Sequence, residues 1–141
     1  MNAHRLLPAV ALLALFALLT ACGGDGGPPS FDGAARASAD GMFSGSVRST
    51  PEPPPVNQMH TWTLHLEDDA GAPVENAEIT VDGDMPAHGH GLPTEPRVTD
   101  YLGNGDYLVE GMQFQMDGEW YVEFTITVED VTDTLRFDFR L

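Results

Sequence analysis

The chain has 141 residues and carries 22 acidic side chains against six lysines and arginines, a formal net charge of −16 at pH 7. Nucleic acids and anionic membrane surfaces are polyanions that attract basic patches, so this charge disfavours both as partners. We expect no nucleic-acid partner, and the acidity is typical of a solvated, self-repelling surface.

The first 21 residues have the pattern of a secretory signal. Arg5 precedes the apolar run Leu6–Leu19, which is too short to span a bilayer, since a spanning helix needs about 20 apolar residues. The run ends in Leu19-Thr20-Ala21-Cys22, which resembles the lipobox of bacterial lipoproteins, whose cysteine is acylated. A coincidental cysteine after an ordinary signal is the alternative, but Cys22 is the only cysteine present. We predict a signal peptide over 1–21, lipid attachment at Cys22, and an extracytoplasmic protein held at the inner or outer membrane.

Residues 22–40 are rich in Gly, Pro, Ala and Ser and contain one aromatic residue, Phe31. Such a segment buries too little apolar surface to offset the entropy of ordering. We therefore predict a flexible tether over 22–40 and one folded domain over 41–141. That domain contains no cysteine, so its core must form without disulfides. A weak first strand is expected at 42–48, before the proline-rich connector 51–55.

From residue 60 onward, apolar and polar residues alternate with the period of two that is typical of strands with one buried face. Trp62 and Trp120 each begin an inward row, and a shift of the apolar parity after Gly111 predicts a β-bulge there. The predicted strands lie at 60–66, 77–81, 97–102, 107–116, 120–128 and 135–141. Six or seven short strands without a helix predict an all-β, immunoglobulin-like antiparallel β-sandwich, with a small barrel as the alternative.

Segment 84–96 differs in its chemistry from an ordinary loop. It contains Met85, His88 and His90 among glycines and prolines that restrict the backbone. In an extended conformation His88 and His90 project to the same side. Imidazoles combined with thioethers suit copper, and thioethers favour Cu(I). The alternative is a rigid structural loop whose imidazoles bind backbone groups that no strand satisfies.

Three further residues complete the predicted copper set. Met112 and Met116 would add thioether sulfurs if their strand lies alongside, and His60 would border the same end of the sandwich. Each has a structural alternative. Methionines at strand spacing more often fill a core, and His60 more often starts an inward row with its hydrogen bonds satisfied.

Several of these segments resemble the YtkA-like domain. The resemblance spans roughly 59–128 and rests mainly on Met85-Pro86-Ala87-His88-Gly89-His90 and on the tryptophan Trp120 that follows Met112–Met116. It implies a small extracytoplasmic all-β domain, related to FixH proteins and comparable in architecture to periplasmic copper carriers. FixH proteins keep a membrane helix, whereas the hydrophobic segment here ends in a lipobox. Much of the family has no assigned activity, so the resemblance names a fold better than a function.

Together these features predict a lipid-anchored protein that binds copper for buffering or delivery outside the cytoplasm. The alternative is a non-catalytic envelope module that binds no metal and contacts an envelope protein through a structural loop, Met85–Pro96. We do not expect an enzyme, because no serine stands out as a nucleophile held by a base and the domain lacks cysteine. No phosphate-binding glycine motif opens a helix.

Overall fold

The computed structural model describes residues 26–141, and both the predicted signal peptide and Cys22 lie outside them. All regular structure in the described part is β, which confirms the all-β prediction. Residues 26–141 hold no helix of the length and hydrophobicity that crossing a bilayer requires. The strands are β1 (Arg36–Ala37), β2 (Phe43–Thr50), β3 (His60–Asp68), β4 (Glu78–Met85), β5 (His90–Gly91), β6 (Arg97–Gly103), β7 (Asp106–Met112), β8 (Glu119–Val128) and β9 (Val131–Arg140).

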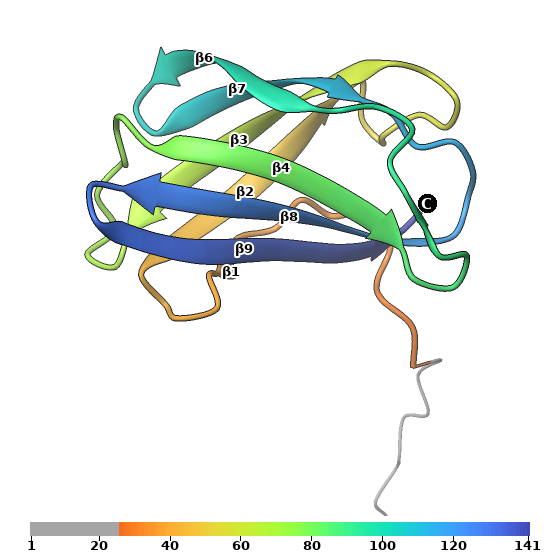
Figure 1. Cartoon of the computed structure of the whole chain (residues 1–141), viewed down its shortest axis with the longest axis horizontal. Coiled ribbons are helices and arrows are strands. Elements are labelled where there is room, and N and C mark those ends of the chain that lie inside the picture. The colour runs from red at the N-terminus through yellow and green to blue at the C-terminus, as the bar shows by residue number, and fades with distance from the viewer. Residues whose placement is uncertain (1–25) are drawn as a thin grey trace, which may run out of the picture.

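The strands pair in the order β1-β2-β3-β7-β6-β4-β8-β9, with β5 attached to β4. Every pair is antiparallel, as predicted. Figure 1 shows β4, β8 and β9 in front of β2 and β3. The orders β2-β3-β7-β6 and β4-β8-β9 are those of a seven-stranded immunoglobulin sandwich. One register pair, Thr80 with Arg97, continues the ladder between the layers, so the fold lies between a sandwich and a barrel.

The core lies between the two layers and is built by the predicted inward rows. Trp62, at the start of its row on β3, and Trp120, at the start of its row on β8, are at most 1% exposed. Each fully buried large apolar side chain contributes about 1.5–3 kcal/mol relative to an exposed one. Because the inward row of β3 faces those of the neighbouring strands β8 and β9, period-two alternation is sufficient to assemble this core without disulfides.

The predicted bulge is present in β7. The register with β3 shifts between the pairs His60–Met112 and Trp62–Val109. Gly111 adopts a φ of 85°, which a residue with a Cβ rarely tolerates. The extra residue turns Met112 inward, where its side chain is fully buried. The bulge therefore sets which side chains of β7 and the following loop reach the core.

The N-terminal boundary of the domain is corrected by the structure. We expected a tether up to residue 40, but the Phe31 ring packs 5.2 Å from Trp62 and 5.3 Å from Phe139. The Gly33 carbonyl accepts a hydrogen bond from the Val47 amide at 3.0 Å. Composition misses this because it averages over the segment, whereas one inserted aromatic ring and a few backbone bonds are enough to dock it.

A buried carboxylate holds the next turn of the chain. Asp133 on β9 is 3% exposed, and its oxygens accept hydrogen bonds from the Ser38 hydroxyl at 2.6 Å and from the backbone amides of Asp40 and Met42. Burial by itself raises the pKa of this carboxyl, but these bonds and one from the Thr134 amide outweigh it, so the net pKa lies below its ordinary value. The segment before β2 is thereby fixed to β9.

Candidate functional site

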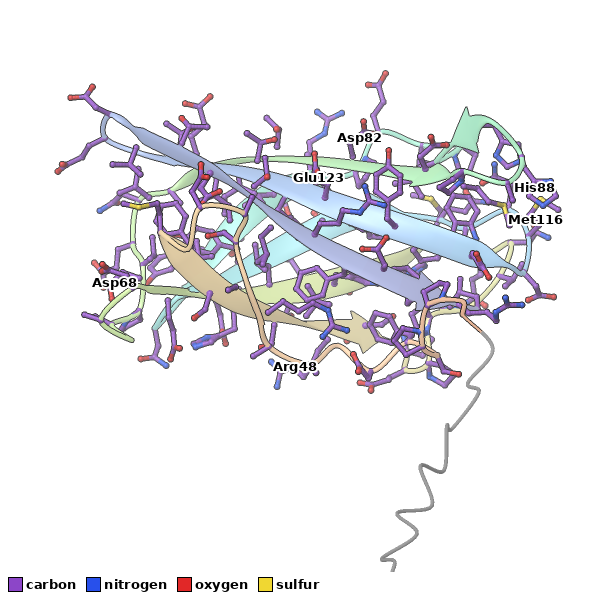
Figure 2. The ribbon with its side chains drawn as sticks, turned by 90° about the horizontal axis from the view of Figure 1, so that it is seen from below. Arg48, Asp68, Asp82, His88, Met116 and Glu123 are labelled. Carbon is purple, nitrogen blue, oxygen red and sulfur yellow. The ribbon has the colours of Figure 1, made fainter. Side chains whose placement is uncertain are left out.

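The histidine-containing turn lies at one end of the sandwich, together with the loop that joins β7 to β8 (Figure 1). Figure 2 shows His88 and Met116 at this end and Asp68 at the opposite end. Gln115, in the loop between β7 and β8, connects this loop to the histidine turn. Its side-chain Nε2 lies 2.9 Å from His90 Nδ1 and 3.1 Å from the Gly91 carbonyl oxygen. Residues distant in sequence thus form one surface.

The turn itself is a tight connection between β4 and β5. Met85 pairs with His90 across the ladder, and the Met85 carbonyl accepts hydrogen bonds from the amides of His88 at 2.9 Å and Gly89 at 3.1 Å. Gly89 has a φ of 64°, in the left-handed region that glycine adopts at little cost. The histidines are therefore presented by a closed turn and the strand that follows it, not by the extended segment that the sequence suggested.

The two imidazoles of this turn are neighbours. Their ring centroids lie 5.7 Å apart with 36° between the ring planes. Imidazole nitrogens bind metals such as zinc at about 2.0–2.1 Å, which places a ring centroid about 3 Å from the ion and two rings on one ion about 5–6 Å apart. His88 is exposed and His90 half-buried, so both can be reached from solvent. The separation of the ring centroids thus falls within the range for two imidazoles on one ion.

Sequence reasoning missed Gln115 as a part of this site. With the amide oriented as described, Gln115 Nε2 donates to His90 Nδ1, and Gln115 Oε1 is buried without a hydrogen-bond partner. The same Nε2 also donates to the Gly91 carbonyl, which fixes the amide in this orientation, so the two bonds hold the His90 ring in place. Partners of this kind orient ligating histidines. The only feature of the sequence that pointed to Gln115 was its position in segment 112–116, between Met112 and Met116.

The three predicted methionine ligands lie at different depths. Met85 is 1% exposed and its Cε contacts Gly118, while Met112 is fully buried beneath the bulge. Met116 is only half-buried, and its carbonyl accepts a hydrogen bond from Trp120 Nε1 at 3.0 Å. Met116 is thus the thioether of the three that lies near the surface at the histidine end. Met85 supports the turn from below.

The structure does not bring His60 next to His90. The His60 ring contacts Phe114 at 5.5 Å, Phe114 contacts Trp120 at 5.2 Å, and Trp120 contacts His90 at 6.2 Å. Two aromatic rings thus connect the two histidines. The six predicted ligands divide into three nearer the surface, His88, His90 and Met116, and three that are buried, His60, Met85 and Met112.

The buried member His60 lies directly opposite Met112 in the ladder. Its Nδ1 lies 3.0 Å from the Gln58 carbonyl, and its Nε2 is buried without a partner. Burial lowers the pKa of His60, and the bond to Gln58 only partly opposes this shift. The ring is therefore held neutral, with Nδ1 as the donor.

Carboxylates do not complete a metal site at this end. Within residues 26–141 no three histidine, cysteine, aspartate or glutamate side chains are grouped to hold a metal ion. An ion at the histidine turn would need a thioether, a backbone oxygen, water or a partner's ligand in addition to the two imidazoles. The donor set of imidazole and thioether is the one that copper accepts most readily.

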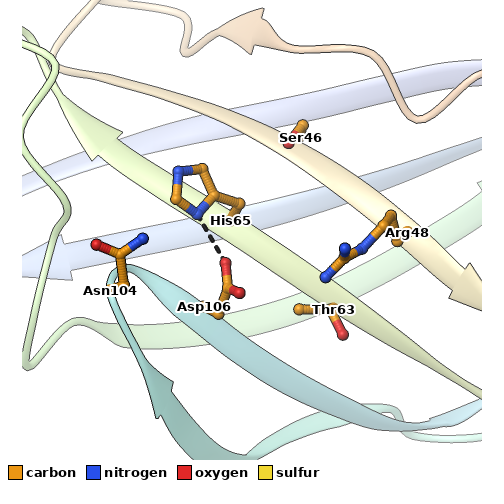
Figure 3. A pocket seen from close by; sticks show the side chains of 6 residues that line it. All are labelled: Ser46, Arg48, Thr63, His65, Asn104 and Asp106. Atoms are coloured by element: carbon orange, nitrogen blue, oxygen red, sulfur yellow. Dashed lines mark hydrogen bonds and ion pairs between the residues drawn. The ribbon is translucent and has the colours of Figure 1, made fainter.

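A separate polar pocket opens on the outer face of the other sheet. It has a cavity volume of about 270 Å³, and its lining comes from β2, β3, the β6–β7 turn and the start of β7 (Figure 3). The residues that line it are Ser46, Arg48, Thr63, His65, Asn104 and Asp106. Sequence reasoning assigned none of them a role beyond turns and outward-facing strand positions.

The fold and this end of the molecule define a small all-β domain with a histidine turn. Residues 44–125 match the family described as YtkA-like, which is more than half of the 141 residues. The chain therefore belongs to the YtkA-like family, and the match begins before the segment, starting near residue 59, on which the resemblance rested. No curated protein matches the chain.

One solved structure with which the chain aligns is a ZirS C-terminal domain. The two share 12% sequence identity over 100% of this chain and 86% of that chain, with a TM-score of 0.41.

Proposed function

We propose that the protein is a lipid-anchored, extracytoplasmic copper-binding protein that buffers the metal or delivers it to a partner. His88 and His90 are the principal ligands, and Met116 supplies a nearby thioether. The observation that carries this proposal is the 5.7 Å separation of the two rings on a closed turn. The strongly acidic chain adds a field that attracts cations.

The position of the N-terminal segment supports a role next to a membrane. Gly27 lies against the Glu119 side chain, and the Arg140 amide donates to the Pro29 carbonyl at 2.8 Å. Glu119 follows Gly118, which contacts Met85 under the histidine turn. The chain thus enters the domain at the histidine end. Five residue steps separate Gly27 from Cys22, a contour of at most about 18 Å, so lipid at Cys22 would keep the turn close to the bilayer.

The test is a Cu(I) titration of the purified protein against a chromogenic Cu(I) chelator. We expect the wild-type protein to compete and the His88→Ala/His90→Ala double variant to bind at least about tenfold more weakly, since it loses both imidazoles. His65→Ala is the matched control, because it removes a half-exposed histidine on the other sheet. Failure to compete, or equal affinities of wild type and double variant, contradicts the proposal.

A metal-free envelope interaction module is the second candidate. Among residues 26–141, no three histidine, cysteine, aspartate or glutamate side chains are grouped to hold a metal ion. This observation favours the metal-free candidate. In that case an envelope protein would be captured equally well with and without copper, and substitutions of His88 and His90 would leave the capture unchanged. Capture that requires copper would favour the metal-handling function.

A further inference from the structure

We infer that the pocket between β2, β3 and β7 is a binding site for a small carboxylate that also carries a hydroxyl group. Two rows of the antiparallel ladder place its residues together. Ser46 pairs with His65, which in turn pairs with Asp106, and Arg48 pairs with Thr63 in the next row. All five therefore project from the same outer face.

The pocket contains an arginine whose guanidinium has no carboxylate partner in the described part of the chain. Arg36, Arg136 and Arg140 each form an ion pair with a neighbouring acidic residue. The guanidinium groups of Arg48 and of the exposed Arg97 take part in no ion pair or hydrogen bond within residues 26–141, and of these two only Arg48 lines a pocket. In so acidic a chain, such an arginine is a preformed site for an external oxyanion, because a guanidinium binds a carboxylate through two parallel hydrogen bonds.

The one carboxylate that lines the pocket, on Asp106, already contacts a histidine. Asp106 Oδ1 lies 2.7 Å from His65 Nδ1 (Figure 3). The other ring nitrogen of His65 lies 3.5 Å from a Glu67 carboxylate oxygen. His65 thus orients Asp106. Oδ2 of Asp106 accepts no hydrogen bond from residues 26–141, so it can accept one from a ligand hydroxyl. Arg48 and Asp106 therefore recognise the two ends of a hydroxy acid.

Short side chains make the space for this ligand. Ser46 and Thr63 place hydroxyls beside Arg48, and the Asn104 amide closes the side nearest the β6–β7 turn. The cavity of about 270 Å³ is slightly smaller than the range of about 300–1,000 Å³ that is typical of sites for drug-sized molecules. Its size and its mostly polar lining suit a hydrophilic ligand of a few carbon atoms.

The experiment is an amide-shift NMR titration of the metal-free, ¹⁵N-labelled protein with glycolate, acetate and inorganic phosphate at constant ionic strength. We expect saturable shifts of the amides of Ser46, Thr63 and Asp106, with the tightest binding for glycolate. Arg48→Gln should weaken glycolate binding at least about tenfold, because a charge-assisted pair is lost. Arg97→Gln, a charge-matched change at an exposed position on β6, should leave it unchanged.

Each other outcome overturns the inference. No saturable shift with any probe shows that the pocket is only a polar surface, and equal binding of phosphate or acetate contradicts recognition of both carboxylate and hydroxyl. Equal losses in the Arg48 and Arg97 variants indicate a diffuse charge effect. Thr63→Val, which keeps the shape of the side chain, should reduce affinity without altering amide shifts elsewhere. The titration contains no copper, so its result does not depend on the metal-binding proposal.

Discussion

At the scale of single residues, His88 and His90 acquire their possible chemistry from the side chains around them. Gln115 holds the His90 ring through its Nδ1, Gly89 closes the turn, and Met85 fills the space beneath it. Only the two histidines, Met85 and the glycine were visible as a motif in the sequence. The role of Gln115 depends on contact between loops 25 positions apart, which no local pattern encodes.

Gln115→Leu should weaken Cu(I) binding by about tenfold while leaving the fold intact, since partners that orient a ligating histidine typically contribute 10–100-fold in metal affinity. The measurement is the chelator competition, with far-UV circular dichroism as the check on folding. Gln113→Leu, two positions earlier, is the matched control. An affinity that stays at the wild-type value in Gln115→Leu would show that the amide does not orient the ligand.

Met85→Ala should destabilise the protein by about 2–5 kcal/mol, because its side chain is 1% exposed and its removal leaves a cavity under the turn. Urea unfolding measures this loss. Met85→Leu, which nearly conserves volume, should cost less than about 1.5 kcal/mol and retain copper binding if Met85 is a packing residue. Loss of copper affinity in a well-folded Met85→Leu variant would instead make Met85 a ligand.

At the scale of elements, the strands with one buried face were predicted well and the ends of the domain were not. The rows of β3, β8 and β9 follow from alternation alone, because a period of two identifies a strand wherever one face meets a core. The docking of 30–40 could not be found that way. It depends on Phe31 entering an aromatic cluster and on Asp133, more than ninety positions later, capping the turn after Ser38.

Asp133→Asn should destabilise the protein by about 1–3 kcal/mol near neutral pH, since it weakens several buried hydrogen bonds to one charged group. The folded-state pKa of Asp133 is lowered, so its stabilising contribution is present above the ordinary pKa of 3.8 and is lost as pH falls through the lower folded value. Thermal unfolding of both proteins should therefore differ at pH 7 and converge in strong acid. Asp138→Asn, at an exposed position on β9, is the control. A difference that is constant with pH would contradict the assignment.

At the scale of the whole molecule, the histidine turn lies at the end where the N-terminal segment enters the domain, while the loop after Asp68 lies at the opposite end (Figure 2). Since a ten-residue strand is about 33 Å long, the two ends lie at clearly different distances from an anchored N-terminus. Under the proposed lipidation, the copper ligands would face components of the same membrane.

A fluorophore attached at Ala87→Cys in the lipidated protein should be quenched by a lipid-borne quencher more strongly than one at Ala70→Cys. We expect this because the chain between Cys22 and Gly27 is short, so the lipid anchor would hold the Ala87 end of the domain nearer the bilayer. Insertion of a long Gly/Ser linker between Gly26 and Gly27 should reduce the difference. Equal quenching of both positions without the insertion would contradict the orientation. A Cys22→Ser variant tests the anchor itself, because it should lose membrane association.

The sequence by itself determined the all-β class, the inward rows, the bulge at Gly111 and the His-Gly-His motif, because each depends on residues close along the chain. Only the tertiary structure decided which candidate ligands meet. Phe114 and Trp120 lie in the line of ring contacts between His60 and His90, and Met112 is turned into the core, while Gln115 reaches the histidine turn. The tertiary structure also brought together the residues of the Arg48 pocket, which come from three strands and the β6–β7 turn. Such contacts depend on strand order and register across the whole ladder, which local periodicity does not specify.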